Sequence, residues 1–180
     1  MRSRTWIVTA FVAALLVTGA TWCQAPGEAP KPGPEHKRME HFLGKWTGSA
    51  EMKPGPFGPG GKMTWTETCE WFEGGFAVVC KSEGSSPMGQ MKGLGILGYN
   101  AEEKFYTYYG VDNSGWSDYS KGKLQGKTWT YSSEGKIGGK PFKSRFAIEE
   151  TSETTQSFKA ETSEDGGKTW TLAMEGTSKK

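Results

Sequence analysis

The chain has 180 residues, a length typical of one domain, and carries 22 Lys and Arg against 20 Asp and Glu. Two of the basic residues, Arg2 and Arg4, lie in the first twenty positions, so the remainder has 20 basic residues (22 − 2) against 20 acidic ones. A nearly neutral domain lacks the clustered positive charge of nucleic-acid binders and of polybasic membrane-surface modules. The two histidines, His36 and His41, leave little for imidazole chemistry.

Residues 1–20 have the pattern of a secretory signal peptide. Arg2 and Arg4 precede an uncharged stretch over residues 6–20, which is shorter than the ~20 residues that span a bilayer as a helix. Small residues end that stretch, as signal peptidase requires, so cleavage is expected after Ala20 or near Ala25. We therefore expect a periplasmic or secreted protein with no integral membrane segment after signal removal.

Residues 21–34 are rich in Pro and Gly and predict an extended linker that buries little apolar surface. Cys23 in this segment leaves open a lipid-tethered form, although Trp22 stands where a small residue usually precedes a lipidated cysteine. Residues 35–43 then predict a short helix with one apolar face, which Gly44 ends.

From residue 45 to 180 there are 19 aromatic residues but only 10 Leu, Ile and Val. Short runs of aromatic residues and Thr alternate with polar residues between Gly-containing turns, a pattern typical of antiparallel sheets. It predicts an all-β domain over 35–180, an antiparallel up-and-down barrel of about ten strands with a short N-terminal helix. The strands are expected near 45–53, 62–73, 76–84, 90–99, 103–111, 115–121, 126–133, 140–150, 153–163 and 168–178.

Alternation within these strands assigns side chains to the barrel interior. Trp170, Leu172 and Met174 are predicted to share the inner face of the last strand, and Tyr106 and Tyr108 to point outward as a possible interface patch. The inner face offers aromatic rings and one acidic residue, Glu67, and Asp118 is a less certain second acidic candidate. The candidate ligand-binding residues are Trp46, Trp65, Glu67, Trp71, Tyr109, Trp116, Trp129, Tyr131 and Phe146. Equally, these rings can fill the core, and Glu67 can bond to Ser82 or to a backbone amide.

The segment Lys53–Gly61 has three prolines and four glycines in nine residues, so it is a long loop rather than a strand. Phe57 at its centre is expected to be exposed. Two roles are open for this loop: a lid over the open end of the barrel, or a plain flexible connection.

Cys69 and Cys80 are predicted to form a disulfide. Gly74 and Gly75 suit a two-residue hairpin turn, in which facing residue numbers sum to 149, so the two cysteines lie opposite each other. Opposite residues in an antiparallel pair are close enough for a disulfide, and an exported protein meets oxidising conditions. The alternation makes 69–80 a hydrogen-bonded pair, so a bulge or a longer turn is expected to adjust the local geometry.

Residues 163–170 fit the S-x-D-x-G-x-T-W pattern of the Asp-box found in sialidase propellers. Here the pattern predicts a hairpin turn, in which Asp165 accepts backbone hydrogen bonds and Trp170 packs beneath. A propeller needs repeats and more chain, and sialidases use clustered arginines, whereas Arg145 is the only arginine after residue 40. A sialidase is therefore excluded.

The order of a short helix followed by G-x-W-x-G at Gly44, Trp46 and Gly48 resembles the entry to calycin barrels, including lipocalins and nitrobindin-like barrels, where the Trp closes the barrel floor. The stretches PEHKRMEHFLGKWTG, CEWFEGGFAVVC, MKGLGILGYNAEEKFYTYYGVDN and EDGGKTWTLAMEG resemble the bacterial family of unknown function DUF1579 from about Pro34 to Lys180. The resemblance implies an exported lipocalin-like barrel with no established activity.

The same resemblance raises haem as a cofactor, because nitrobindin-like barrels hold haem through a histidine late in the chain. This sequence has no histidine after His41, so we expect no haem and no other cofactor. His and Cys clusters suited to a metal are absent from the sequence as well.

Three function classes follow. The preferred one is non-covalent binding of a small apolar or aromatic molecule inside the barrel, by a protein that is not an enzyme. The second is a structural or interaction protein with a self-filled barrel, possibly a homodimer. The third is a weak hydrolase that uses Glu67, which would lose ester hydrolysis in Glu67→Gln.

Overall fold

A computed structural model describes residues 29–180; the predicted signal peptide and Cys23 lie outside the described residues. A short helix α1 (Pro34–Arg38) and a 3₁₀ turn η1 (Met39–Phe42) precede ten strands. The predicted helix is thus split into two short pieces. The strands are β1 (Gly44–Met52), β2 (Gly61–Trp71), β3 (Ala77–Ser86), β4 (Gly89–Asn100), β5 (Phe105–Asp112), β6 (Ser117–Gln125), β7 (Thr128–Ile137), β8 (Lys140–Glu150), β9 (Thr155–Ser163) and β10 (Thr171–Lys179).

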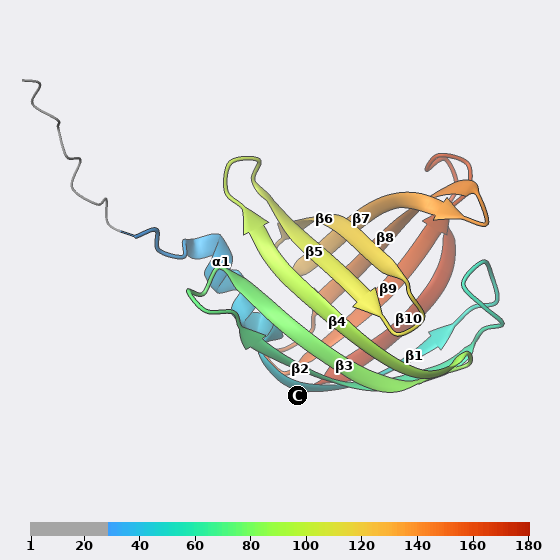
Figure 1. Cartoon of the computed structure of the whole chain (residues 1–180), viewed down its shortest axis with the longest axis horizontal. Helices are drawn as coiled ribbons and strands as arrows, with labels where there is room; N and C mark the ends of the chain where they lie inside the picture. The colour runs from blue at the N-terminus through green and yellow to red at the C-terminus, as the bar shows by residue number, and fades with distance from the viewer. Residues whose placement is uncertain (1–28) are drawn as a thin grey trace, which may run out of the picture. The chain divides into compact units, whose positions relative to one another are not determined.

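Each strand pairs antiparallel with its neighbours in sequence, and β1 also pairs with β10, so the sheet is a closed ten-stranded barrel (Figure 1). The predicted all-β up-and-down barrel is confirmed. Figure 1 shows the helical segment at one end of the barrel and the loop between β1 and β2 at the other. We call these the closed end and the open end.

The hairpin of β2 and β3 has the predicted register, with Cys69 opposite Cys80 and Glu67 opposite Ser82. The turn, however, spans four residues, because the Phe72 amide donates to the Ala77 carbonyl at 2.8 Å. This bond moves the hydrogen-bonded pairs by one position, so 69–80 becomes a non-hydrogen-bonded pair, the closer type. The Cα atoms of the two cysteines are 4.0 Å apart and the disulfide is formed.

The tyrosines of β5 lie on the faces opposite to those predicted. Tyr106 is buried and Tyr108 points into the barrel, whereas Tyr109 is 52% exposed on the outer face. Tyr109 stacks there on Tyr119, with ring centroids 4.7 Å apart. The prediction that Tyr106 and Tyr108 form an outer patch was wrong. This strand carries aromatic rings on both faces, so alternation alone does not decide which face points inward.

The last strand also departs from strict alternation. A bulge between Leu172 and Met174 shifts the register, so Met174 faces Ala160 while Leu172 faces Glu161. Trp170 lies on the outer side, where its ring packs against the Arg145 guanidinium at 4.3 Å. A bulge adds one residue to one strand and reverses the faces beyond it, so Leu172 and Met174 do not share a face as predicted.

Candidate functional site

The interior next to the helical segment is fully packed. Trp46 and Trp129 are 2% and 0% exposed there, and the indole nitrogen of Trp46 donates to the Phe42 carbonyl at 2.8 Å. We call this region the closed half. Its buried side chains are Met39, Phe42, Trp46, Cys69, Val78, Cys80, Leu97, Tyr106, Trp129 and Ile148. The resemblance to calycin barrels implied a Trp at the floor, and Trp46 takes that place.

Polar contacts at Glu150 fasten the helical segment to the barrel. The Glu150 carboxylate accepts hydrogen bonds from the Trp129 indole at 2.7 Å and from Arg38 at 2.9 Å. His41 lies 3.1 Å from the amide oxygen of Gln156, and burial lowers the pKa of this imidazole even though Glu150 opposes the shift. His41 is therefore neutral in the folded protein at pH 7.

Toward the open end, several inward-facing side chains are only half-buried. Trp65 and Phe146 are two of these, and both pack against Phe158, with ring centroids 5.6 and 5.5 Å apart. We call this region the open half, lined by half-buried Trp65, Glu67, Ser82, Tyr108, Asp118, Ser144 and Phe146. The predicted residues Trp65, Glu67, Tyr131 and Phe146 all come together here or at its boundary with the closed half.

Glu67 projects into the open half from the middle of β2. Its carboxylate makes no hydrogen bond or ion pair with any described residue, so the expected bond to Ser82 is not formed even though the two residues face each other. Burial raises its pKa. One carboxylate oxygen lies within 4.8 Å of both cysteine sulfurs, but these sulfurs are bonded to each other and are not the thiolates that bind metals.

A band of hydroxyl groups lines the inner face of β6, β7, β8 and β9. Tyr108 faces Ser120, Ser133 faces Ser144, and Ser144 faces Thr162 in the strand register. Ser133 and Ser144 are hydrogen-bonded at 2.7 Å, and the Ser120 hydroxyl donates to Asp118 at 2.5 Å. We call these four residues the hydroxyl belt: Ser120, Ser133, Ser144 and Thr162.

Two tyrosines border the hydroxyl belt, with ring centroids 6.3 Å apart. Burial, together with the negative charges of Glu67, Asp118 and Asp112, raises the pKa of Tyr108 to about 12. Burial likewise raises the pKa of Tyr131 well above its usual value. The Tyr131 hydroxyl is buried without a hydrogen-bond partner among the described residues, which is rare for a buried polar atom.

Glycines on neighbouring strands leave room for these tyrosine rings to lie against the barrel wall. A Cβ on Gly122 would lie 2.5 Å from the Tyr131 ring, and a Cβ on Gly95 or Gly110 would lie 2.9 Å from the Tyr108 ring. The rings therefore take the space that side chains on the neighbouring strands would fill.

The loop between β1 and β2 reaches across the open end. Phe57 contacts Trp116, in the turn before β6, and Phe142 of β8, with centroid distances of 6.0 and 5.8 Å. Phe57 is consequently half-buried rather than exposed as expected. In this structure the loop has the position of a lid.

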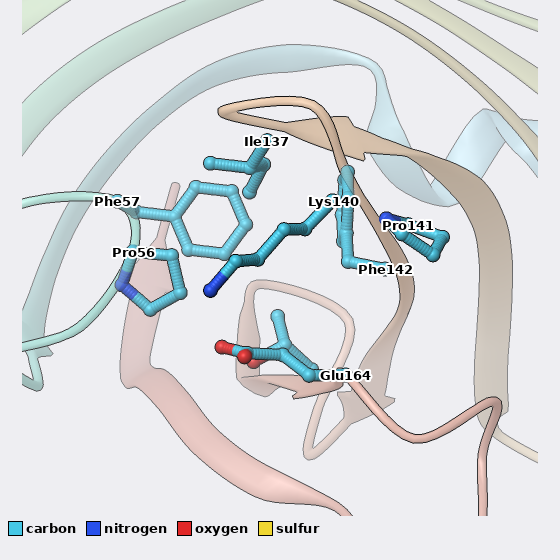
Figure 2. Close-up of a pocket in the computed structure, with 8 residues that line it drawn as sticks. Pro56, Phe57, Ile137, Lys140, Pro141, Phe142 and Glu164 are labelled. Atoms are coloured by element: carbon cyan, nitrogen blue, oxygen red, sulfur yellow. The ribbon is translucent and has the colours of Figure 1, made fainter.

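A pocket of about 300 Å³ lies beneath this loop. Figure 2 shows Pro56 and Phe57 on one side of it, with Ile137, Lys140 and Phe142 of the β7–β8 hairpin and Glu164 on the others. Thr162 also lines the pocket, so it reaches the hydroxyl belt. Sequence analysis singled out Phe57, but the contact of its loop with β8 could be found only from the three-dimensional structure.

Five predicted ligand-binding residues lie away from the open half. Tyr109 is on the outer face, Trp71 is 37% exposed at the rim of the closed end, and Trp116 is 41% exposed in the mouth beside Phe57. Trp46 and Trp129 point inward but are enclosed in the closed half. Tyr108, Phe158 and the hydroxyl belt were not among the predicted residues. Tyr108 was assigned to the outer face, and polar inward positions such as Ser144 were given no role.

The model of the family described as "Protein of unknown function (DUF1579)" matches residues 31–180. The chain belongs to the DUF1579 family. The match confirms the resemblance inferred from the sequence, and it covers the whole barrel together with the helical segment.

Comparison with solved structures supports the barrel fold of this DUF1579 chain. It is similar to the protein in "Crystal Structure of Rv2717c from M. tuberculosis", with a TM-score of 0.58 and 12% sequence identity over 82% of this chain and 98% of that one. At this identity the similarity concerns the fold alone. A search of curated proteins finds no match. Within residues 29–180, neither helix is long and apolar enough to cross a membrane.

Proposed function

We propose that the protein is an exported, non-enzymatic barrel that binds a small, largely apolar or aromatic molecule in its open half. The observation that carries this proposal is the contrast within one interior. The side chains of the closed half are buried, while inward-facing Trp65 and Phe146 remain half-buried. Apolar rings exposed to the lumen of a barrel are the usual lining of a small-molecule site.

The mouth pocket supports the same proposal. Its volume of about 300 Å³ is at the lower end of the range of small-molecule sites. Phe57 and Phe142 supply apolar surface, and Thr162 offers a hydroxyl where the pocket meets the lumen. The disulfide supports export, because such bonds persist in oxidising compartments.

A neutral fluorescent probe tests the binding proposal. N-phenyl-1-naphthylamine is expected to bind the purified protein with a rise in its emission, and Phe146→Ala is expected to weaken binding at least fivefold. Tyr109→Ala is the matched control, because it removes an aromatic ring of the outer face and should leave the affinity unchanged. Absence of binding, or an equal loss in both variants, would refute the proposal.

A role in surface interaction is the second candidate. Five exposed side chains are neighbours on the outer face of β4, β5 and β6: Leu94, Ile96, Tyr109, Val111 and Tyr119. Stable interfaces use about 20–30 residues on each side, so this patch is too small to hold a stable homodimer by itself. Sedimentation of the same samples as a concentration-dependent dimer, with no probe binding, would favour this candidate over the first.

A further inference from the structure

The open half of the barrel contains negative charge without a matching positive charge. Glu67 enters from β2 and Asp118 from β6, and neither carboxylate takes part in an ion pair with a described residue. The inward-facing positions around them on β2 to β6 are Ser, Gly, Cys and aromatic residues, together with Asp112 at the end of β5. The Asp112 carboxylate accepts hydrogen bonds from Ser114 and Trp116 within its own turn. The lysines of these strands, such as Lys81 and Lys121, lie at outward-facing positions and are exposed.

The two carboxylates face a common region of the lumen. The Tyr108 ring lies over Gly95 and Gly110. Gly110 faces Asp118 in the register, and Gly95 faces Cys80, whose sulfur lies within 4.8 Å of a Glu67 carboxylate oxygen. The negative charges of Glu67, Asp118 and Asp112 accordingly all raise the pKa of Tyr108. Asp118 accepts one short hydrogen bond from Ser120, whereas Glu67 accepts none. The Tyr131 hydroxyl, whose ring is 6.3 Å from that of Tyr108, is buried and has no partner among the described residues. An unpaired carboxylate such as that of Glu67 is costly to bury alone, and a cation that pairs with it removes that cost.

Aromatic faces surround the same region. Trp65 and Phe146 border it from β2 and β8, and Tyr108 and Tyr131 from β5 and β7. Aromatic faces attract organic cations through the ring quadrupole, and the attraction is stronger where water is largely displaced. A set of rings together with carboxylates is the arrangement that recognises ammonium groups.

We propose that the ligand of the open half is an organic ammonium compound, whose cationic nitrogen pairs with Glu67 and Asp118 and whose apolar body packs against Trp65 and Phe146. This inference rests on the proposed binding function and specifies its ligand class. A metal ion fits less well. The one group of three potential ligand residues within bonding reach among residues 29–180 is Glu67 with the two disulfide-bonded cysteines.

The test compares two ligands of nearly the same size and apolar body, 2-(1-naphthyl)ethylammonium and 2-(1-naphthyl)ethanol, by calorimetric titration of the purified protein at pH 7. The ammonium compound is expected to bind at least tenfold more tightly than the alcohol. Glu67→Gln and Asp118→Asn are each expected to reduce that ratio at least threefold while the affinity for the alcohol stays within twofold. Either variant suffices if the other fails to fold.

Glu70→Gln is the control, because Glu70 lies on the same strand at an exposed, outward-facing position and should leave the ratio unchanged. Equal affinities for the two compounds, or a preference that Glu67→Gln and Asp118→Asn leave intact, would overturn the inference while leaving the binding function in place. If neither compound nor N-phenyl-1-naphthylamine binds, the proposed function itself fails, and the inference fails with it.

Discussion

The two halves of the barrel interior are built from the same strands but differ in whether their polar groups have hydrogen-bond partners. In the closed half, polar atoms of buried rings are satisfied, as with the Trp129 indole on Glu150 and the Trp46 indole on the Phe42 carbonyl. In the open half, the Glu67 carboxylate and the Tyr131 hydroxyl lack partners among the described residues. The closed half thus contributes stability, whereas the open half retains groups that reduce stability unless something binds them.

The largest test of this contrast removes one tryptophan from each half. Trp129→Ala is expected to lower the free energy of unfolding by about 3–5 kcal/mol, because it empties a fully buried site. Trp65→Ala is expected to cost less than about 2 kcal/mol, since half-buried rings lose less contact area. Urea denaturation measures both. A loss in Trp65→Ala equal to that in Trp129→Ala would contradict the division of the interior into two halves.

The disulfide is the next largest effect expected in the closed half. The Cys69→Ala, Cys80→Ala double variant should lose about 3 kcal/mol of stability, the value for a short loop closed by a disulfide. Its affinity for N-phenyl-1-naphthylamine should remain that of the wild type at temperatures where it stays folded. Reduction of the wild-type protein should reproduce the loss of stability, and a variant as stable as the wild type would be inconsistent with a structural role.

Glu67→Gln is expected to change stability in the opposite direction. The pKa of Glu67 is raised in the folded protein, so folding favours the protonated form, and the wild type loses stability as the pH rises from the unfolded pKa through the folded one. At pH 7 the neutral amide should therefore be more stable by about 1 kcal/mol. Below about pH 4 the carboxyl is protonated in both states and the difference should disappear. Destabilisation at pH 7 would indicate that Glu67 has a partner in the folded protein.

The smallest expected effect concerns His41 in the closed half. Burial lowers its pKa, so its contribution to stability is fully present above the unfolded pKa of about 6.5 and is lost as the pH falls toward the folded value. His41→Gln should remove up to about 1 kcal/mol of this acid sensitivity. Thermal unfolding between pH 7.5 and 5.5 measures the difference in slope between variant and wild type. Equal slopes would show that other groups cause the acid sensitivity.

The sequence predicted the parts of this fold that depend on local pattern. Alternation identified ten strands, and the position of two glycines placed Cys69 opposite Cys80 even though the turn has four residues rather than two. The register survived because the extra residues were added symmetrically to both sides of the turn. Local pattern was also enough to place Trp65, Glu67 and Phe146 on the inner face.

The parts that could not be predicted depend on partners distant in sequence. Tyr108 points inward because Gly95 and Gly110 leave space for its ring on the barrel wall, and the local sequence does not reveal which glycines will lie beside it. The face on which Leu172 lies was predicted wrongly because of a bulge that the strand sequence does not indicate. Whether an inward ring is enclosed or open to solvent depends on which end the helical segment closes, and this separates Trp129 from Trp65.

The pairing of β1 with β10 has a consequence for how the protein is made. Thr47 lies opposite Lys179, so the seam that completes the ring joins segments separated by most of the domain. Contacts so distant in sequence form slowly, and until the final strand leaves the ribosome the first strand has an unpaired edge. The nascent chain therefore passes through an incomplete, aggregation-prone sheet, and chaperone protection during synthesis would matter most during that interval.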